Sequence, residues 1–237
     1  MAKLVLIRHG QSEWNALNLF NGWIDTKLSP VGVEQAKKAG QAVAAEGIEF
    51  DQAYTSVLTR AITTLHYALE EANQLWIPEE KAWQLNERHY GALQGLNKDD
   101  ARAKWGADQV QLWRRSYDTL PPLLEDVEET VTIDGKTYPA FDRRYYNVPE
   151  GELPMGENLK VTLERVLPYW DEKISKDLKA GKNVIIAAHG NSLRALVKHI
   201  EEISDDDIMG VEIANGQPWV YDLDENLKVV DKKILEA

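Results

Sequence analysis

Two short apolar runs, far apart in the chain, end in the same way, and they constrain the fold more than any other feature. Residues 4–7 (LVLI) are followed by Arg8-His9-Gly10, and residues 184–188 (VIIAA) are followed by His189-Gly190. Runs of this length that are rich in branched aliphatic residues are typical of parallel strands buried on both faces. We therefore predict an α/β fold in which two imidazoles meet at the carboxyl edge of one sheet, where open α/β sheets bind ligands.

The residue types at these strand ends indicate a site for an anion. Arg8 directly precedes His9, and a guanidinium group can bind two phosphoryl oxygens at once. A neutral imidazole is a competent nucleophile near pH 7 because its pKa is about 6.5. Phosphate is the leading candidate ligand, and the alternative is that His9 is a structural residue that caps its strand.

The charge balance excludes some classes of partner. Lysine plus arginine total 27 and aspartate plus glutamate total 39, which gives a net charge of −12. A general nucleic-acid-binding protein needs a basic face, so we expect no nucleic-acid partner. An anionic substrate is not attracted by the protein as a whole, and it requires a local cluster of cations in a cleft.

Composition also limits the chemistry and the compartment. The chain has no cysteine, which excludes disulfides, thiolate chemistry and zinc ribbons. No apolar run approaches the roughly 18 residues that suggest a membrane-spanning helix. The run at residues 4–7 is too short for the core of a signal peptide. We therefore expect a soluble, cytoplasmic protein with no membrane partner.

Strand and helix signals alternate along the first part of the chain, as in a layered α/β protein. Ser29 as N-cap and Pro30 at the first helical position predict a helix that ends at Gly47. A strand over 50–54 and a helix through 58–69 follow. Residues 81–117 have an irregular pattern that is dense in aromatic residues and arginine.

The second part of the chain contains a hairpin signal and a long helix. Asp134-Gly135 lies between two β-prone triplets and predicts a surface hairpin. We expect a helix over 158–178 that bends at Pro168, a helix after the second histidine that runs through 193–200, and a final strand over 217–223. The chain shows no linker or repeat, so we predict a single domain over 1–237.

Two further charged residues belong to the expected site. Arg60 lies on the first turn of the helix that follows the strand ending at Tyr54. Beside a sheet-edge crevice, this arginine can act as a second phosphate clamp. Glu87 lies among cationic residues in the segment LNERHYG, where it can hold or give one proton. His66 and His199 fall within helical patterns, and we interpret both as structural or exposed.

Six ordered segments together resemble the histidine phosphatase superfamily, and within it the phosphoglycerate mutases that depend on 2,3-bisphosphoglycerate. The resemblance extends from Lys3 to about Asp222. Six blocks in order are far more specific than one. They are LVLIRHGQSEWN (4–15), FNGWIDTKLSPVG (20–32), YTSVLTRA (54–61), LNERHYGALQGLNK (85–98), WRRSYDTLPP (113–122) and VIIAAHGNSLRAL (184–196).

The resemblance implies a fold and a set of site residues. The fold is a mostly parallel central sheet with helices on both faces. His9 is the nucleophile that becomes phosphohistidine, with Arg8, Arg60 and His189 around the phosphoryl group. Glu87 is the proton donor and acceptor. The residues implied to hold the rest of the substrate are Ser12, Asn15, Asn21, Gly22, Arg88, Tyr90, Lys98, Arg114, Arg115, Gly190 and Asn191. Asn21 stands where many relatives have a small hydroxyl residue, which is compatible with a contact through the backbone.

The resemblance also implies a reaction. The enzyme interconverts 3-phosphoglycerate and 2-phosphoglycerate in glycolysis and gluconeogenesis, after 2,3-bisphosphoglycerate has phosphorylated His9, and it needs no metal. The alternative is a phosphatase that transfers the same phosphoryl group from small phosphate esters to water. A catalytically silent protein would be expected to lack His9, Arg60 or Glu87, and all three are present. A homodimer is the family-level expectation for the assembly.

Overall fold

The computed structural model describes residues 1–149 and 151–237, and its centre is a six-stranded sheet in the order β3-β2-β6-β1-β7-β8. The pairs β3–β2, β2–β6 and β6–β1 are parallel, whereas β1–β7 and β7–β8 are antiparallel. The prediction of an α/β fold with a mostly parallel sheet is confirmed. The strands of this sheet are β1 (Ala2–Arg8), β2 (Gln52–Thr55), β3 (Glu79–Lys81), β6 (Val184–Ala188), β7 (Pro218–Leu223) and β8 (Val229–Ile234).

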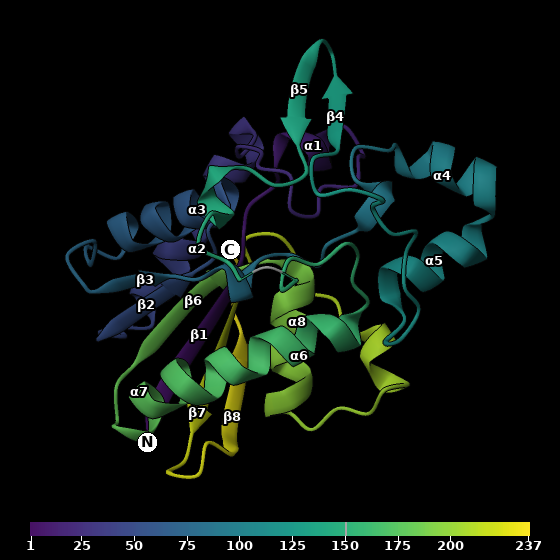
Figure 1. The fold of residues 1–237 in the computed structure, drawn as a ribbon. Helices are drawn as coiled ribbons and strands as arrows, with labels where there is room; N and C mark the ends of the chain where they lie inside the picture. The colour runs from purple at the N-terminus through teal and green to yellow at the C-terminus, as the bar shows by residue number, and fades with distance from the viewer. Residues whose placement is uncertain (150) are drawn as a thin grey trace.

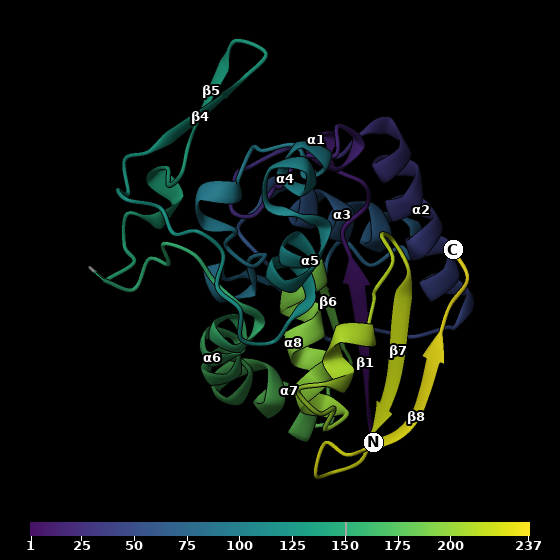
Figure 2. The same cartoon turned by 90° about the vertical axis from the view of Figure 1, so that its right-hand side faces the viewer.

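Helices cover both faces of this sheet (Figure 1). In Figure 2, α2 lies on the opposite side of β1 from α6 and α8. The α-helices are α1 (Glu13–Ala16), α2 (Pro30–Ala45), α3 (Thr59–Glu71), α4 (Lys98–Trp105), α5 (Ala107–Arg115), α6 (Leu159–Tyr169), α7 (Ser175–Lys179) and α8 (Gly190–Ile200). Short 3-10 turns lie at Trp83–Leu85, Gly91–Leu93, Arg143–Tyr145 and Asp207–Gly210.

The side chains of the central strand β1 alternate between two apolar cores, one on each face of the sheet. Leu4 and Leu6 of β1 belong to one core cluster, which includes Leu193 and Leu196 of α8. Val5 and Ile7 of the same strand belong to a second cluster, with residues of α2 and α3. Because successive side chains point to opposite faces and both faces are covered, every position of the strand is apolar.

The structure corrects several predicted elements. The segment 81–117, whose sequence pattern is irregular, contains α4 and α5. The strand predicted over 50–54 is β2, Gln52–Thr55. The helix predicted over 158–178 is interrupted by a π-helical turn at Trp170–Ile174, which begins two residues after Pro168. Proline has no N–H for the helical ladder.

The strand predicted to be the last is followed by β8, whose residues Lys232 to Ile234 pair with β7. This part of the C-terminal tail therefore lies at the edge of the sheet. Leu235 donates its backbone N–H to Pro218 and is buried in the core beside α2 and α3. Within the two described segments, no helix is both long and apolar enough to cross a bilayer.

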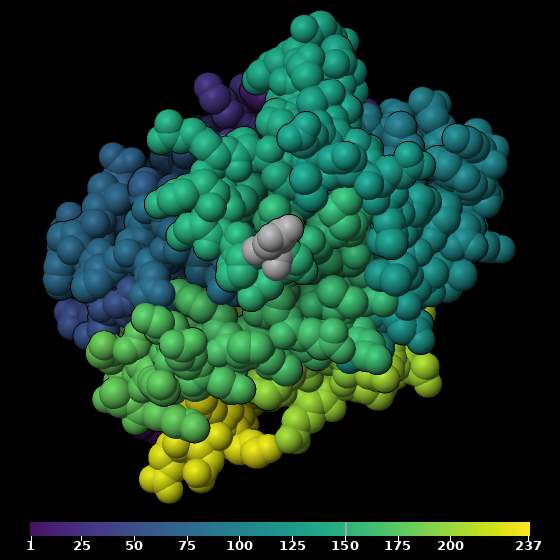
Figure 3. All heavy atoms as spheres, viewed as in Figure 1, coloured from purple at the N-terminus to yellow at the C-terminus, as the bar shows by residue number. Residues whose placement is uncertain are grey.

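The predicted hairpin is confirmed as β4 (Thr130–Ile133) paired with β5 (Lys136–Pro139). Asp134 and Gly135 have φ of 50° and 76°, the left-handed conformation that a tight two-residue turn requires at both central positions. The hairpin projects from the surface at the top of Figure 3. Val131, Ile133 and Tyr138 of the hairpin pack against Trp14, Leu19 and Ile24.

Candidate active site

The two histidines meet where the opening pattern places them. β1 and β6 are parallel neighbours in register, so His9 and His189 follow the paired residues Arg8 and Ala188. Their ring centroids are 5.0 Å apart, and both side chains are buried. Figure 2 shows β1 pointing toward the end of the molecule that carries α1, α4 and α5. The site therefore lies at the carboxyl edge of the sheet, beneath these helices.

Local geometry fixes the tautomer of His9. Its Nδ1 lies 2.6 Å from the carbonyl oxygen of Gly10. Because a carbonyl oxygen only accepts, Nδ1 carries the hydrogen and Nε2 keeps its lone pair in the neutral ring. Burial, followed by the charges of Arg60 and Arg8, holds the pKa of His9 well below its usual value. His9 is thus a neutral imidazole with a free Nε2 near pH 7.

The second histidine is also neutral. Burial first, and then the charge of Arg60, holds the pKa of His189 well below its usual value. Its Nε2 lies 2.7 Å from the hydroxyl oxygen of Ser56. Its Nδ1 is buried and has no hydrogen-bond partner in the described part of the chain.

Two arginines supply positive charge beside the histidines. Arg8 donates through Nη1 to the carbonyl oxygen of Ile213, and its buried Nε has no partner among the described residues. Arg60 donates to the carbonyl oxygens of Gly22 and Ile24 at 2.6 and 2.9 Å. Burial lowers the pKa of Arg60 to about 10, so it remains charged at neutral pH. Arg60 therefore shapes the loop after α1 and also places a positive charge in the site.

Glu87 is the acidic group of the site. Its Oε1 accepts hydrogen bonds from the backbone N–H groups of Arg88 and Asn191, at 2.8 and 3.1 Å. One carboxylate oxygen and one nitrogen of each histidine, His9 and His189, lie within 4.8 Å of one another. A single carboxylate held this close to a nucleophilic imidazole can accept and return one proton.

These three ligand-bearing side chains also resemble the donor set of a metal site. However, Arg60 and Arg8 lie close enough to lower the pKa of both imidazoles. The same positive charges would oppose a bound cation, since unit charges about 4 Å apart interact by roughly 4 kcal/mol at an effective dielectric near 20. The donor set and its surroundings therefore suit an anion.

A cavity lined by Arg8 and Glu87 opens next to the two histidines, which do not themselves line it, and we call it the cationic pocket. Five positively charged side chains and one carboxylate line it. Among the cations, Lys98 has its pKa lowered by burial first and by the charge of Arg114 second. This local surplus of positive charge contrasts with the net charge of −12. The lining residues are Arg8, Asn15, Phe20, Asn21, Gly22, Glu87, Tyr90, Lys98, Arg114, Arg115, Gly190, Asn191, Arg194 and Ile213.

Most residues expected to hold the substrate line this pocket, and two do not. Ser12 caps α1 and donates its hydroxyl to Oδ1 of Asn21. Arg88 is buried, and its Nη2 donates to the carbonyl oxygen of Arg114 and to Oδ1 of Asn191. Both residues therefore support side chains that reach the pocket. The side chain of Asn21 accepts from Ser12 and Thr26 and donates to Ile24, which leaves its backbone available to a ligand.

Three lining residues were missed by sequence reasoning. Arg194 lies one helical turn after Gly190 and Asn191 on α8, so helical spacing could have found it. It donates to the carbonyl oxygens of Ile208 and Val211 and to Oδ1 of Asn191. Phe20 and Ile213 are apolar, and no signal distinguishes them from core residues.

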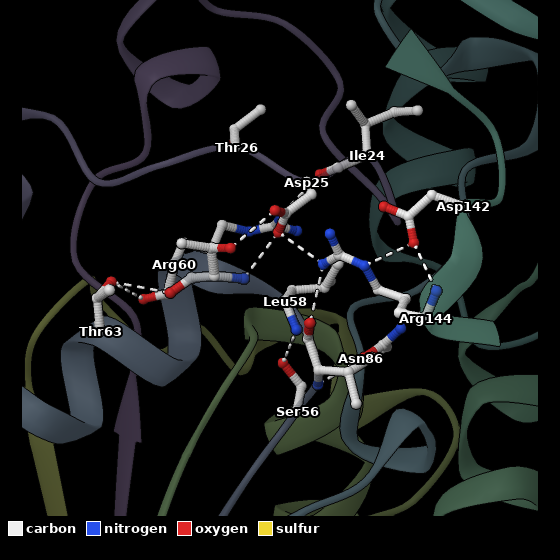
Figure 4. A network of polar contacts seen from close by, with 12 residues as sticks. Ile24, Asp25, Thr26, Ser56, Leu58, Arg60, Thr63, Asn86, Asp142 and Arg144 are labelled. Carbon is white, nitrogen blue, oxygen red and sulfur yellow. Dashed lines mark hydrogen bonds and ion pairs between the residues drawn. The ribbon is translucent and has the colours of Figure 1, made fainter.

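A second, wider hollow lies on the surface near Val57, Thr59 and Tyr146. Figure 4 shows the network beside it, in which Arg144 contacts the carboxylates of Asp25 and Asp142. Asp25 also accepts from the backbone N–H and hydroxyl of Thr59, at the start of α3. Because Arg144 is already paired with two carboxylates, it is a poor candidate to bind an anionic ligand.

The chain is similar to known proteins in family, sequence and fold. The family model described as "Histidine phosphatase superfamily (branch 1)" matches residues 4–132 and 127–233. The chain is 64% identical to the 2,3-bisphosphoglycerate-dependent phosphoglycerate mutase 2 of Latilactobacillus sakei over 235 residues, which cover 99% of this chain and 100% of that protein. It is 60% identical to the 2,3-bisphosphoglycerate-dependent phosphoglycerate mutase of Actinobacillus succinogenes, over 98% of this chain and 100% of that one.

Among solved structures, a mycobacterial glucosyl-3-phosphoglycerate phosphatase in complex with VO3 superposes with a TM-score of 0.70 at 20% identity. The superposition covers 100% of this chain and 98% of the phosphatase. At this level of identity the likeness concerns the fold alone.

Proposed function

The chain belongs to the histidine phosphatase superfamily, and on that premise we propose that it interconverts 3-phosphoglycerate and 2-phosphoglycerate through a phosphohistidine at His9. One observation carries this proposal. A neutral histidine whose Nε2 has no hydrogen bond to the described residues lies next to a pocket whose cations come from separate parts of the chain. Phosphoglycerate has two anionic ends, a phosphate and a carboxylate, and therefore needs two positive poles.

The two poles are assigned by position. Arg8 and Arg60 are the charges that act on both histidines, and they would bind and neutralise the phosphoryl group next to His9. Lys98 and Arg114 lie on α4 and α5, together with Arg115, and would bind the other anionic end. A phosphatase that accepts many small esters has no need of this second pole, so the pocket favours the mutase over the hydrolase.

The side chains divide the chemistry between them. Nε2 of His9 attacks the phosphorus, while the hydrogen on Nδ1 stays bonded to Gly10. Glu87 takes the proton from the hydroxyl that attacks the phosphohistidine and returns it to the leaving oxygen in the reverse step. Phosphoryl transfer depends mainly on positioning and on neutralisation of charge, which the arginines supply.

The related mutases named above are 2,3-bisphosphoglycerate-dependent. The bisphosphate would supply the phosphoryl group that primes His9. The buried nitrogens of Arg8, Arg60 and His189 that lack partners in the described residues fit a phosphate, and Lys98, Arg114 and Arg115 fit the second phosphate.

The test is an isomerisation assay. 3-Phosphoglycerate is supplied with and without 2,3-bisphosphoglycerate, and 2-phosphoglycerate and free phosphate are measured together. We expect isomerisation that depends on the bisphosphate, with little free phosphate, and no turnover by His9→Ala. Rapid release of phosphate without isomerisation would instead support the hydrolase, and full activity of His9→Ala would exclude the phosphohistidine.

We further propose that the chain works as a homodimer in the cytoplasm. Strand β3 lies at an edge of the central sheet, and the nearby Leu75 and Trp76 are exposed apolar residues, which supports an interface there. Phosphoglycerates are charged and do not cross a bilayer unaided, which supports a cytoplasmic site of action. Light scattering after size-exclusion chromatography tests the assembly, and a monomer at micromolar concentration would contradict the dimer.

A further inference from the structure

Ser56 makes the one hydrogen bond to the ring of His189 among the described residues. It follows β2 directly and is fully buried. Its hydroxyl oxygen lies 2.7 Å from Nε2 of His189 and accepts a hydrogen bond of 3.1 Å from the backbone N–H of Leu58. Figure 4 shows the Ser56–Leu58 bond at the turn into α3. The side chain is therefore held in one orientation by the backbone of that turn.

The direction of the Ser56–His189 hydrogen bond follows from the partners available. A hydroxyl has one hydrogen to donate and two lone pairs that accept. The Leu58 N–H occupies one lone pair, and within residues 1–149 and 151–237 the only acceptor for the hydroxyl hydrogen is Nε2 of His189. If Nε2 carried a hydrogen and donated it instead, the hydroxyl hydrogen would be buried without an acceptor, which is unfavourable.

This direction determines the other nitrogen of the ring. A neutral imidazole that accepts at Nε2 carries its hydrogen on Nδ1. Nδ1 of His189 is the ring nitrogen that is buried without a partner in the described residues. It and Nε2 of His9 are the two ring nitrogens that have no hydrogen bond to the described residues. One nitrogen of each ring belongs to the cluster that includes the Glu87 carboxylate.

We propose that Ser56 is a positioning residue that holds His189 in the Nδ1–H tautomer, so that this N–H donates to the phosphoryl group as it forms and breaks its bond to His9. This inference rests on the proposed function, and it assigns to Ser56 a role in which it does not touch the substrate. In the other tautomer, Nδ1 would present a lone pair to the phosphoryl oxygens and repel them.

The tautomer of His189 can be observed directly, without substrate. The experiment is a long-range ¹H–¹⁵N correlation spectrum of the whole protein labelled at histidine, in which the His189 signals are those lost in His189→Asn. We expect the pattern of a neutral ring protonated at Nδ1. A ring protonated at Nε2 would overturn the proposal, whether or not the enzyme isomerises phosphoglycerate.

The variant Ser56→Ala tests the consequence. Without the hydroxyl, we expect His189 to shift toward the Nε2–H tautomer, and the rate of His9 phosphorylation to fall about tenfold or more with little change in KM. Ser204→Ala is the matched control, because the Ser204 hydroxyl bonds Asp207 at an exposed position. An Nδ1–H ring together with unchanged phosphorylation in Ser56→Ala would refute the role assigned to Ser56.

Discussion

Replacing Arg165 with methionine should destabilise the protein more than any exposed substitution. Arg165 lies on α6, and its guanidinium contacts the Glu157 carboxylate at 2.7 Å through Nε and at 3.0 Å through Nη2. It also donates to the carbonyl oxygens of Gln84, Asn86 and Glu87, at 2.6, 3.1 and 2.8 Å respectively. Arg165 thus fastens the segment that carries Glu87 to the body of the protein.

The magnitude follows from burial. The side chains of Arg165 and Glu157 are 10% and 1% exposed. Removing one partner of a buried ion pair costs about 3–5 kcal/mol, because the other charge is left uncompensated in a medium of low dielectric. Most domains have a free energy of unfolding of about 5–15 kcal/mol, so this is a large fraction of the total. The lost bonds to three carbonyl oxygens add to the same effect.

A double-mutant cycle separates the charge from the other contacts. The additional change Glu157→Gln removes the stranded carboxylate, so the double variant should be more stable than the sum of the single effects predicts, by about 0.5–3 kcal/mol. The measurement is the urea midpoint at constant slope. Lys228→Met is the control, because its ion pair with Glu202 is exposed at 62% and 73%. Equal midpoints for Arg165→Met and Lys228→Met would refute the reasoning.

Three further predictions concern pH, specificity and packing. Burial lowers the pKa of His89 to about 3 and holds those of His9 and His189 well below normal. Unfolded histidines bind protons below about pH 6.5. The free energy of unfolding should therefore be constant above that pH and fall as the pH decreases to 5. Each of these histidines contributes a loss of up to about 1.4 kcal/mol for each pH unit. Urea midpoints that do not change between pH 7 and pH 5 would contradict this. Lys98→Met should weaken binding of 3-phosphoglycerate about tenfold or more, but leave inhibition by vanadate nearly unchanged. If steady-state assays showed that the variant binds 3-phosphoglycerate and vanadate more weakly by the same factor, two separate positive poles would be excluded. Gly190→Ala should lower kcat/KM about tenfold, because the added Cβ would lie 3.3 Å from Cζ and Nε of Arg8. Gly210→Ala is the control and should be neutral, because its added Cβ meets no described atom within 4 Å. Equal kcat/KM values for the two variants would contradict the prediction.

Sequence patterns located elements whose burial is regular. β1 and β6 are covered on both faces and α3 buries one apolar stripe, so their patterns in the sequence are clear. α4 was missed because only Ala101 of its eight residues is buried, and its N-terminus is stabilised by the Asn97 cap rather than by an apolar face. β8 was missed because charged residues occupy much of this edge strand, as is usual where an edge must not pair with other chains.

The candidate site was predictable only in part, for a related reason. His9 and His189 were found because each directly follows a strand, and the strands pair side by side. Ser56 and Arg165 act through partners that are 133 and 78 positions away, and one sequence does not say which residues meet at that separation. Contacts of this kind depend on the packed fold.

The site also departs from the usual rules of a stable interior, and the departure locates its function. Buried polar atoms normally have partners. Yet three buried nitrogens without a partner in the described residues belong to Arg8, Arg60 and His189, all at the carboxyl edge of the sheet. A cluster of unpaired donors is unfavourable for the empty protein, because each lost its bonds to water on folding. Phosphoryl oxygens are acceptors without hydrogens, so a bound phosphate can satisfy several of these donors together. The same atoms that weaken the fold are thus the ones that select an anion of this chemistry.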